Sequence, residues 1–213
     1  MSLQLGALAR VPLLEVQGTE TYYRSVLVTA LMQIERAKFL SGEHAGTLGG
    51  RYNSPGSAPT LYLAGSQTLA SFEVEQDLLL AGLIQGTPTR LMCGVEVVGA
   101  KLLDLTNVVV RNALGIDQHD LVQPGVVRTG LNAAGAPSQT QMLGDAIRQR
   151  PDCDGIKVPT ALGPVFHPGF PRLHNLVLFQ DRNDPVKLRR SGPTLTVVDP
   201  TSLVTQLDSM PGA

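Results

Sequence analysis

The sequence predicts an α+β fold in a single domain, with a mixed sheet flanked by helices. The chain has 213 residues, of which 43% are hydrophobic, so it can bury one good core. Short apolar runs of strand character are mixed with helical segments without regular alternation, which argues against a doubly wound parallel sheet. No internal repeat is visible, so a repeat architecture is not expected.

The first predicted elements surround a glycine-rich loop. Residues 22–38 are largely apolar, and their later part suits a helix. Residues 41–58 are rich in glycine and proline, which favours a loop. A short apolar strand follows at residues 60–64, and Ser66 is a suitable N-cap for a helix over residues 67–83. Strand, turn and helix therefore follow one another directly.

The second half of the chain supplies more strands and two helices. Residues 91–98 and 101–105 are apolar or β-branched runs separated by Gly99, as in a pair of strands or one bulged strand. The remaining predicted elements are a short helix after Thr106, a helix over residues 139–150, and strands at residues 155–161 and 174–181.

Both ends of the chain are expected to flank the main domain. Residues 1–18 lack a sustained period, and residues 183–213 contain four prolines among scattered Ser and Thr. We therefore expect an N-terminal flank, a domain over residues 19–182 and a C-terminal extension. Residues 193–199 could still add an edge strand, and the apolar pieces of the extension could serve a homodimer as easily as the monomer's core.

Charge and hydropathy narrow the function classes. The formal net charge of -1 gives no general attraction to nucleic acid or anionic lipid, so direct nucleic-acid binding is not expected. The chain begins without a signal-peptide pattern, and no apolar run approaches the length of a membrane span. These observations predict a soluble cytoplasmic protein without a membrane role.

Familiar catalytic and metal-binding motifs are missing. Cys93 and Cys153 stand far apart and are expected to be buried thiols, and the four histidines never fall at paired ligand spacing. No metal is therefore expected. The glycines of GGRYN do not open a helix after a strand, so they fail the context of a dinucleotide-binding phosphate turn.

Three polar residues stand out in the predicted glycine-rich loop and in the strand and helix that follow it. Arg51 follows two glycines, where its guanidinium could clamp a diphosphate. Tyr62 alternates to the face opposite Leu61 and Leu63, and its ring could stack on a heterocycle or could be a half-buried sheet tyrosine. Glu73, in the following helix, could face a cleft or could be an ordinary exposed carboxylate.

An ordered series of motifs resembles the RES-domain family, the toxin half of RES/Xre toxin–antitoxin pairs. The fold of that family is similar to that of ADP-ribosyltransferase toxins, which implies a split mixed sheet. The resemblance covers about residues 23–181. Its motifs are YR at 23–24, GGRYNSPG at 49–56, LYLA at 61–64, TLASFE at 68–73, TQMLGDAIR at 140–148, DGIKVPTA at 154–161 and NLVLF at 175–179.

The resemblance implies a role for five residues. It makes Glu73 catalytic with Arg51 and Tyr62, and it adds Arg24 and Thr160 to the residues that bind NAD. Thr160 departs from the serine that the family pattern has at this position. Threonine keeps the hydroxyl but adds a methyl group and restricts χ1, so it can still hydrogen-bond a ribose or amide.

The resemblance also implies an activity and a partner. NAD would be the substrate, and its bond between nicotinamide and ribose would be cleaved by water or phosphate. An alternative is transfer of ADP-ribose to a protein or nucleotide. A non-catalytic binding domain is a third interpretation, supported by the change at Thr160 and the two flanks. An Xre-type helix-turn-helix antitoxin is the expected partner.

Overall fold

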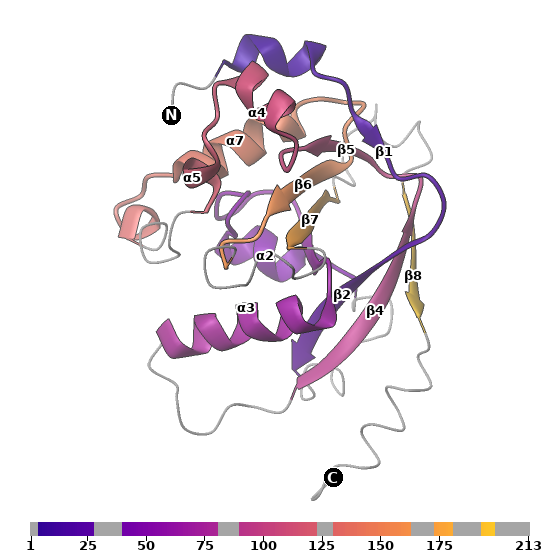
Figure 1. The fold of residues 1–213 in the computed structure, drawn as a ribbon. Coiled ribbons are helices and arrows are strands. Elements are labelled where there is room, and N and C mark those ends of the chain that lie inside the picture. The colour runs from indigo at the N-terminus through magenta and orange to yellow at the C-terminus, as the bar shows by residue number, and fades with distance from the viewer. Residues whose placement is uncertain are drawn as a thin grey trace, which may run out of the picture.

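The computed structural model describes residues 4–27, 40–80, 90–122, 130–162, 173–180 and 193–198 (Figure 1). The helix predicted in the later part of residues 22–38 therefore lies outside the described residues, as do the pieces of the C-terminal extension beyond residue 198. The strands are β1 (Leu14–Glu15), β2 (Glu20–Leu27), β3 (Thr60–Ala64), β4 (Arg90–Val98), β5 (Lys101–Asp104), β6 (Gly155–Pro159), β7 (His174–Phe179) and β8 (Thr194–Val198). The helices are the 3-10 helix η1 (Leu5–Arg10) and the α-helices α2 (Glu43–Leu48), α3 (Gln67–Leu80), α4 (Val108–Leu114), α5 (Gln118–Leu121) and α7 (Gln139–Arg148).

The eight strands form one curled, mixed sheet in the order β1-β5-β6-β7-β3-β2-β4-β8. Strands β5 and β6 are parallel, and the other neighbours are antiparallel. The pairing between β2 and β3 is limited to Tyr23 opposite Ala64, whereas β2 pairs with β4 along its whole length. The sheet is thus split between β3 and β2, which confirms the predicted α+β fold with a split mixed sheet.

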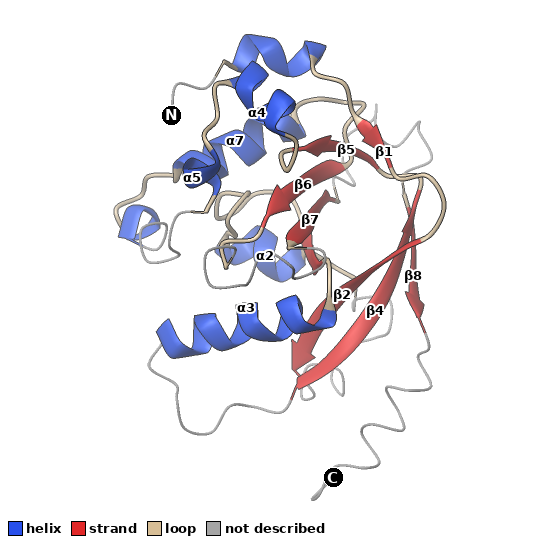
Figure 2. Cartoon of the chain, in the orientation of Figure 1, coloured by secondary structure: helices blue, strands red, loops and turns tan. Residues whose placement is uncertain are grey.

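Helices cover the sheet on the two sides of this split (Figure 2). η1, α4, α5 and α7 lie together beside β5 and β6, while α3 crosses near β2. A first core cluster joins these four helices to one face of the sheet through residues such as Leu143, Ile156 and Val177. A second cluster, which includes Leu61 and Leu63, fills the opposite face. Tyr62 packs against the first cluster, as its alternation with Leu61 and Leu63 predicted.

The structure differs from the prediction in the glycine-rich region. Helix α2 lies inside residues 41–58, which were predicted as loop. Tertiary contacts explain the helix: the Gly42 N–H donates to the Gln180 side chain at 2.6 Å, and the Thr60 N–H donates to the Gly42 carbonyl at 3.1 Å. The Ser41 hydroxyl also accepts the Glu43 N–H at 3.1 Å, as a residue at a helix start does. These contacts to β3 and to the end of β7 are not local in sequence, so composition alone could not predict them.

Both flanks contribute strands to the sheet. β1 pairs with β5 at one edge, and Val16, which follows β1, is buried in the second cluster. β8 pairs with β4 and forms the other edge, at the position where an added edge strand was considered. Strands β4 and β5, separated by Gly99, are distinct strands that pair with different neighbours.

The two cysteines are placed as predicted. Cys93 and Cys153 are free thiols and buried.

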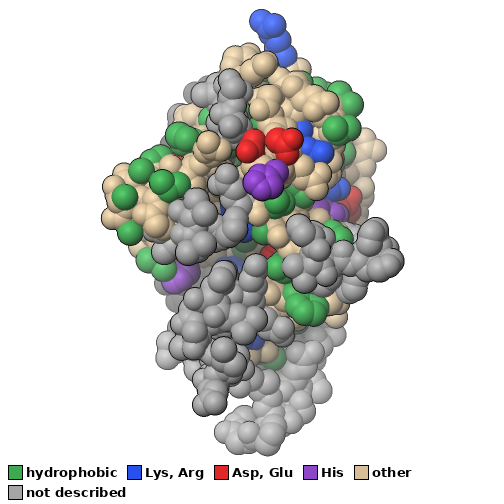
Figure 3. Space-filling view, turned by 60° about the vertical axis from the view of Figure 1, so that its left-hand side comes forward, with side chains coloured by type: hydrophobic (Ala, Val, Ile, Leu, Met, Phe, Trp, Pro, Cys, Tyr) green, Lys and Arg blue, Asp and Glu red, His purple; other side chains and the backbone are tan. Residues whose placement is uncertain are grey.

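On the face shown in Figure 3, exposed apolar side chains fall in several separate groups. Among all described large apolar side chains, the most exposed are Val109 on α4, at 71%, and Leu48 on α2, at 61%. None of the helices in the described ranges has the length and apolar character that a membrane crossing requires.

Candidate functional site

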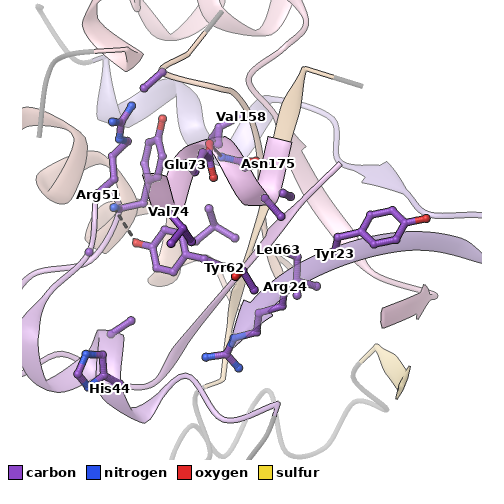
Figure 4. Close-up of a pocket in the computed structure, with 18 of the residues that line it drawn as sticks. Tyr23, Arg24, His44, Arg51, Tyr62, Leu63, Glu73, Val74, Val158 and Asn175 are labelled. Atoms are coloured by element: carbon purple, nitrogen blue, oxygen red, sulfur yellow. Dashed lines mark hydrogen bonds between the residues drawn. The ribbon is translucent and has the colours of Figure 1, made fainter. Parts of the chain in front are cut away.

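A cavity of about 450 Å³ lies at the split of the sheet (Figure 4). One wall comes from β2 and the start of β4, and the other comes from β3, β6 and β7. Helix α3 and the loop of residues 49–52 contribute Glu73 and Arg51 to the same cavity. Its volume is within the range of small-molecule sites. The loss of pairing between β2 and β3 therefore makes room for a ligand between the two parts of the sheet.

The Glu73 carboxylate is held by side chains from two neighbouring strands. Its Oε1 accepts a hydrogen bond from the Thr160 hydroxyl at 2.9 Å and one from the Asn175 amide at 2.5 Å. Thr160 directly follows β6 and is 1% exposed, and Asn175 lies in β7. Figure 4 shows the Glu73 and Asn175 side chains together at one end of the cavity. Glu73 is thus a half-buried, oriented carboxylate rather than an ordinary surface one.

Tyr62 holds the loop that carries Arg51. Its hydroxyl accepts the Tyr52 N–H at 2.9 Å and donates to Asn53 Oδ1 at 2.7 Å, and its ring lines the cavity. Gly50 is required beside it, because a Cβ at this position would overlap the Tyr62 hydroxyl and the Asn53 amide. The loop therefore has a fixed shape where it meets β3.

Helix α7 also holds this loop, through hydrogen bonds and close packing. The Gln141 amide, which is buried, donates to the carbonyls of Gly50 at 3.0 Å and Asn53 at 3.2 Å. Gly144 lets the helix approach the Tyr52 carbonyl more closely than any side chain would permit. Tyr52 itself is buried in the first core cluster, and burial raises the pKa of its hydroxyl, which donates to the Leu121 carbonyl at 3.3 Å. Tyr52 thus packs in the core.

Arginines dominate the charge of the cavity. Arg24 donates to the Ser41 carbonyl at 3.3 Å, and Arg90 donates through Nε to the Ser25 hydroxyl at 2.9 Å. Arg51 donates to the Leu121 carbonyl at 3.3 Å, and in Figure 4 its guanidinium points away from that of Arg24, on the other side of Tyr62. Burial lowers the pKa of Arg24, and the nearby Arg90 guanidinium lowers it further.

The balance of charge favours an anionic ligand. Among the described lining residues there are three arginines (Arg24, Arg51 and Arg90) and one acid, Glu73. Guanidinium groups bind phosphate oxygens with directed, charge-assisted hydrogen bonds. The described residues hold no group of three or more His, Cys, Asp or Glu side chains that could bind a metal ion.

The predicted site residues meet at this cavity. Arg24, Arg51, Tyr62 and Glu73 all line it, and Thr160 contacts it through its bond to Glu73. Two further residues, Arg90 and Asn175, were not singled out from the sequence. Asn175 carried a signal, because it is a polar residue near the start of an otherwise apolar strand. Arg90 carried none, because it reaches the cavity through its pairing with Leu27 across β2 and β4.

The fold and the site define an α+β domain with a split mixed sheet and an arginine-rich cavity around one oriented carboxylate. The chain belongs to the RES-domain family: the family model for the RES domain matches residues 28–199. Its fold is similar to that of a chain in the crystal structure of the M. tuberculosis MbcT–MbcA toxin–antitoxin complex, with a TM-score of 0.58. That match has 22% sequence identity and covers 97% of each chain. No curated protein matches the sequence.

Proposed function

We propose that this protein is the NAD-cleaving toxin of a toxin–antitoxin pair and that it breaks the bond between nicotinamide and ribose. The observation that carries the proposal is the Glu73 carboxylate, oriented by Thr160 and Asn175 in a cavity whose other described charges are arginines. Membership of the RES-domain family and a fold shared with a chain of a toxin–antitoxin complex support the toxin role.

The chemistry of the bond agrees with a site that offers a carboxylate. Nicotinamide leaves as a neutral molecule from a cationic ring, so the leaving group needs no protonation. The developing charge is an oxocarbenium-like ribose, which a nearby carboxylate stabilises more strongly in the transition state than in the ground state. Glu73 would supply this stabilisation, and it would accept a hydrogen bond from a ribose hydroxyl.

The remaining residues would bind and orient the substrate. Arg24 and Arg90, together on the β2–β4 side, would bind phosphate oxygens of the diphosphate, and Arg51 would bind from the other side of Tyr62. The Tyr62 ring would contact the nicotinamide side of the substrate. Thr160 would act chiefly through Glu73, since its hydroxyl already donates to that carboxylate.

An antitoxin follows from the proposed activity. An enzyme that consumes NAD without restraint would drain the cell, so an inhibitor that covers the cavity is expected, and we propose an Xre-type helix-turn-helix protein for this role. Leu48, exposed and at the same time part of the cavity lining, offers an apolar contact at the mouth. Co-expression with the product of a neighbouring helix-turn-helix gene should relieve growth arrest caused by this chain.

Incubation of the purified protein with NAD tests the activity. Wild type should release nicotinamide, measured by chromatography, and Glu73→Gln, which removes the charge and keeps the shape, should lower the rate by at least roughly a hundredfold. Arg10→Ala, an exposed change outside the cavity, is the matched control and should cleave at the wild-type rate. A folded wild-type protein that leaves NAD intact would refute the proposal and would favour a non-catalytic binding domain.

The fate of ADP-ribose separates two forms of the activity. With NAD labelled in the adenylate part, hydrolysis or phosphorolysis should leave the label in free ADP-ribose or in its 1''-phosphate. Label on a protein or nucleotide from a cell extract would instead show that the enzyme is an ADP-ribosyltransferase.

A further inference from the structure

We infer that Asn175 is a positioning residue for Glu73: its amide holds the Glu73 carboxylate ionised and turned toward the cavity. The inference deepens the proposed function and rests on it for its catalytic consequence. The contact itself can be tested without any NAD cleavage.

The backbone of Asn175 is fixed on both sides. In the sheet, Asn175 lies opposite Ala64 of β3 and opposite Val158 of β6. Asn175 is therefore in the interior of the sheet, one strand away from the split where the cavity opens. Thr160 approaches from the end of β6, where its N–H donates to the Leu173 carbonyl at 3.2 Å. Two rigid strands thus bring a donor each to the same oxygen of Glu73.

The Asn175 amide has one orientation that suits an ionised Glu73. Its nitrogen donates to Glu73 Oε1 at 2.5 Å, whereas the reverse orientation would place two acceptor oxygens against each other. In the observed orientation Asn175 Oδ1 is buried and has no hydrogen-bond partner in the described part of the chain. A buried unsatisfied acceptor destabilises a fold. Since one polar atom of the Asn175 amide has this unfavourable environment, the favourable contribution of the amide comes from its hydrogen bond to Glu73.

Both donors favour the charged form of the carboxyl. Thr160 Oγ1 accepts the Leu162 N–H at 3.1 Å, which directs its own hydrogen toward Glu73. Hydrogen bonds donated to a carboxylate stabilise the ion relative to the acid. Stabilisation of an oxocarbenium ion requires that ion, so Asn175 would control the pH range over which Glu73 works.

Two substitutions at position 175 test the inference. Asn175→Ala removes the donor, and Asn175→Asp, close in shape, replaces it with a second carboxylate that must share a proton with Glu73. In both variants Glu73 should titrate at higher pH than in wild type, and for Asn175→Asp the displacement should be about one pH unit or more. Asn107→Asp is the matched control, since it adds the same charge at a helix N-cap outside the cavity, where aspartate is equally suitable.

The readout is the NMR titration of the Glu73 carboxyl carbon, assigned by its loss in Glu73→Gln, together with the pH profile of NAD cleavage. We expect the acid limb of that profile to move to higher pH in step with the titration. An unchanged Glu73 titration in folded Asn175→Ala and Asn175→Asp would overturn the inference. A displaced titration in a protein that never cleaves NAD would support the contact and refute the proposed function. If one variant fails to fold, the other decides.

Discussion

The two ends of the cavity are built in different ways. At one end a single carboxylate, Glu73, is held by donors from two strands of the larger part of the sheet. At the other end Arg24 and Arg90 extend from β2 and β4 of the smaller part and bind the Ser41 carbonyl and Ser25. In the proposed function the two ends have different roles: the glutamate end acts on the ribose, and the arginine end binds the phosphates. The split in the sheet brings the two together.

Removal of the arginine end should have the largest effect on substrate binding. The double variant Arg24→Ala/Arg90→Ala loses charge-assisted bonds worth roughly 1.5–3 kcal/mol each, so KM for NAD should rise about a hundredfold or more. The turnover rate kcat should change little, because Glu73 stays in place. Steady-state kinetics, with Arg10→Ala as the control, check this. A large loss of kcat at unchanged KM would contradict a role of the two arginines in substrate binding, since they would then act on the reaction itself.

Tyr62→Phe tests whether the loop between the two ends is held from β3. The variant keeps the ring but removes the hydroxyl that bonds Tyr52 and Asn53. The free energy of unfolding should fall by roughly 1–3 kcal/mol, which corresponds to a Tm lower by roughly 2–12 °C for a chain of this size. Tyr23→Phe, in the same cavity but on β2, should change Tm less. Equal Tm values for wild type and Tyr62→Phe would show that the hydroxyl does not stabilise the loop.

Thr160 allows a finer test of the glutamate end. Thr160→Val keeps the shape and removes the donor, so kcat for NAD cleavage should fall by about tenfold, the effect of one hydrogen bond of roughly 1–1.5 kcal/mol. Thr160→Ser restores the serine of the family pattern and should retain activity near wild type. A valine variant as active as wild type would remove Thr160 from the set of residues that orient Glu73.

The smallest expected effect concerns Cys93, which lies opposite Arg24 across β2 and β4. Burial raises the pKa of its thiol from an ordinary value of 9.0 to about 11, while Arg24 lowers it. At pH values between about 9 and 11, the thiol is ionised in the unfolded chain but still protonated in the folded one. The free energy of unfolding should therefore fall as pH rises over this range. For Cys93→Ala, the free energy of unfolding, measured with denaturant, should depend less steeply on pH over this range than that of wild type. At pH 7 to 8 the two proteins should show the same slope. An identical slope in both proteins would contradict the assignment.

The sequence predicted the parts of the site that depend on local pattern. Alternation in TLYLA placed Tyr62 on the face opposite Leu61 and Leu63, and the directly following helix brought Glu73 beside the same strand. The ordered motifs of the family added Arg24 and Thr160, which the structure brings to the same cavity.

Long-range pairing explains what the sequence could not predict. Arg90 reaches the cavity only because β2 and β4 pair in a register that places it opposite Leu27. Helix α2 forms in a segment with the composition of a loop because Gln180 and Thr60, distant in sequence, bond to Gly42. The single pair that joins β2 to β3 determines where the sheet opens, and no local pattern encodes it.

Calorimetric binding of NAD to Glu73→Gln, measured together with nicotinamide release by the same preparation, separates substrate binding from bond cleavage. Because the arginine end is intact in this variant, we predict an NAD affinity within a few-fold of the wild-type value and almost no release of nicotinamide. Release at the wild-type rate, or loss of NAD binding by a folded Glu73→Gln protein, would contradict the different roles of the two ends of the cavity.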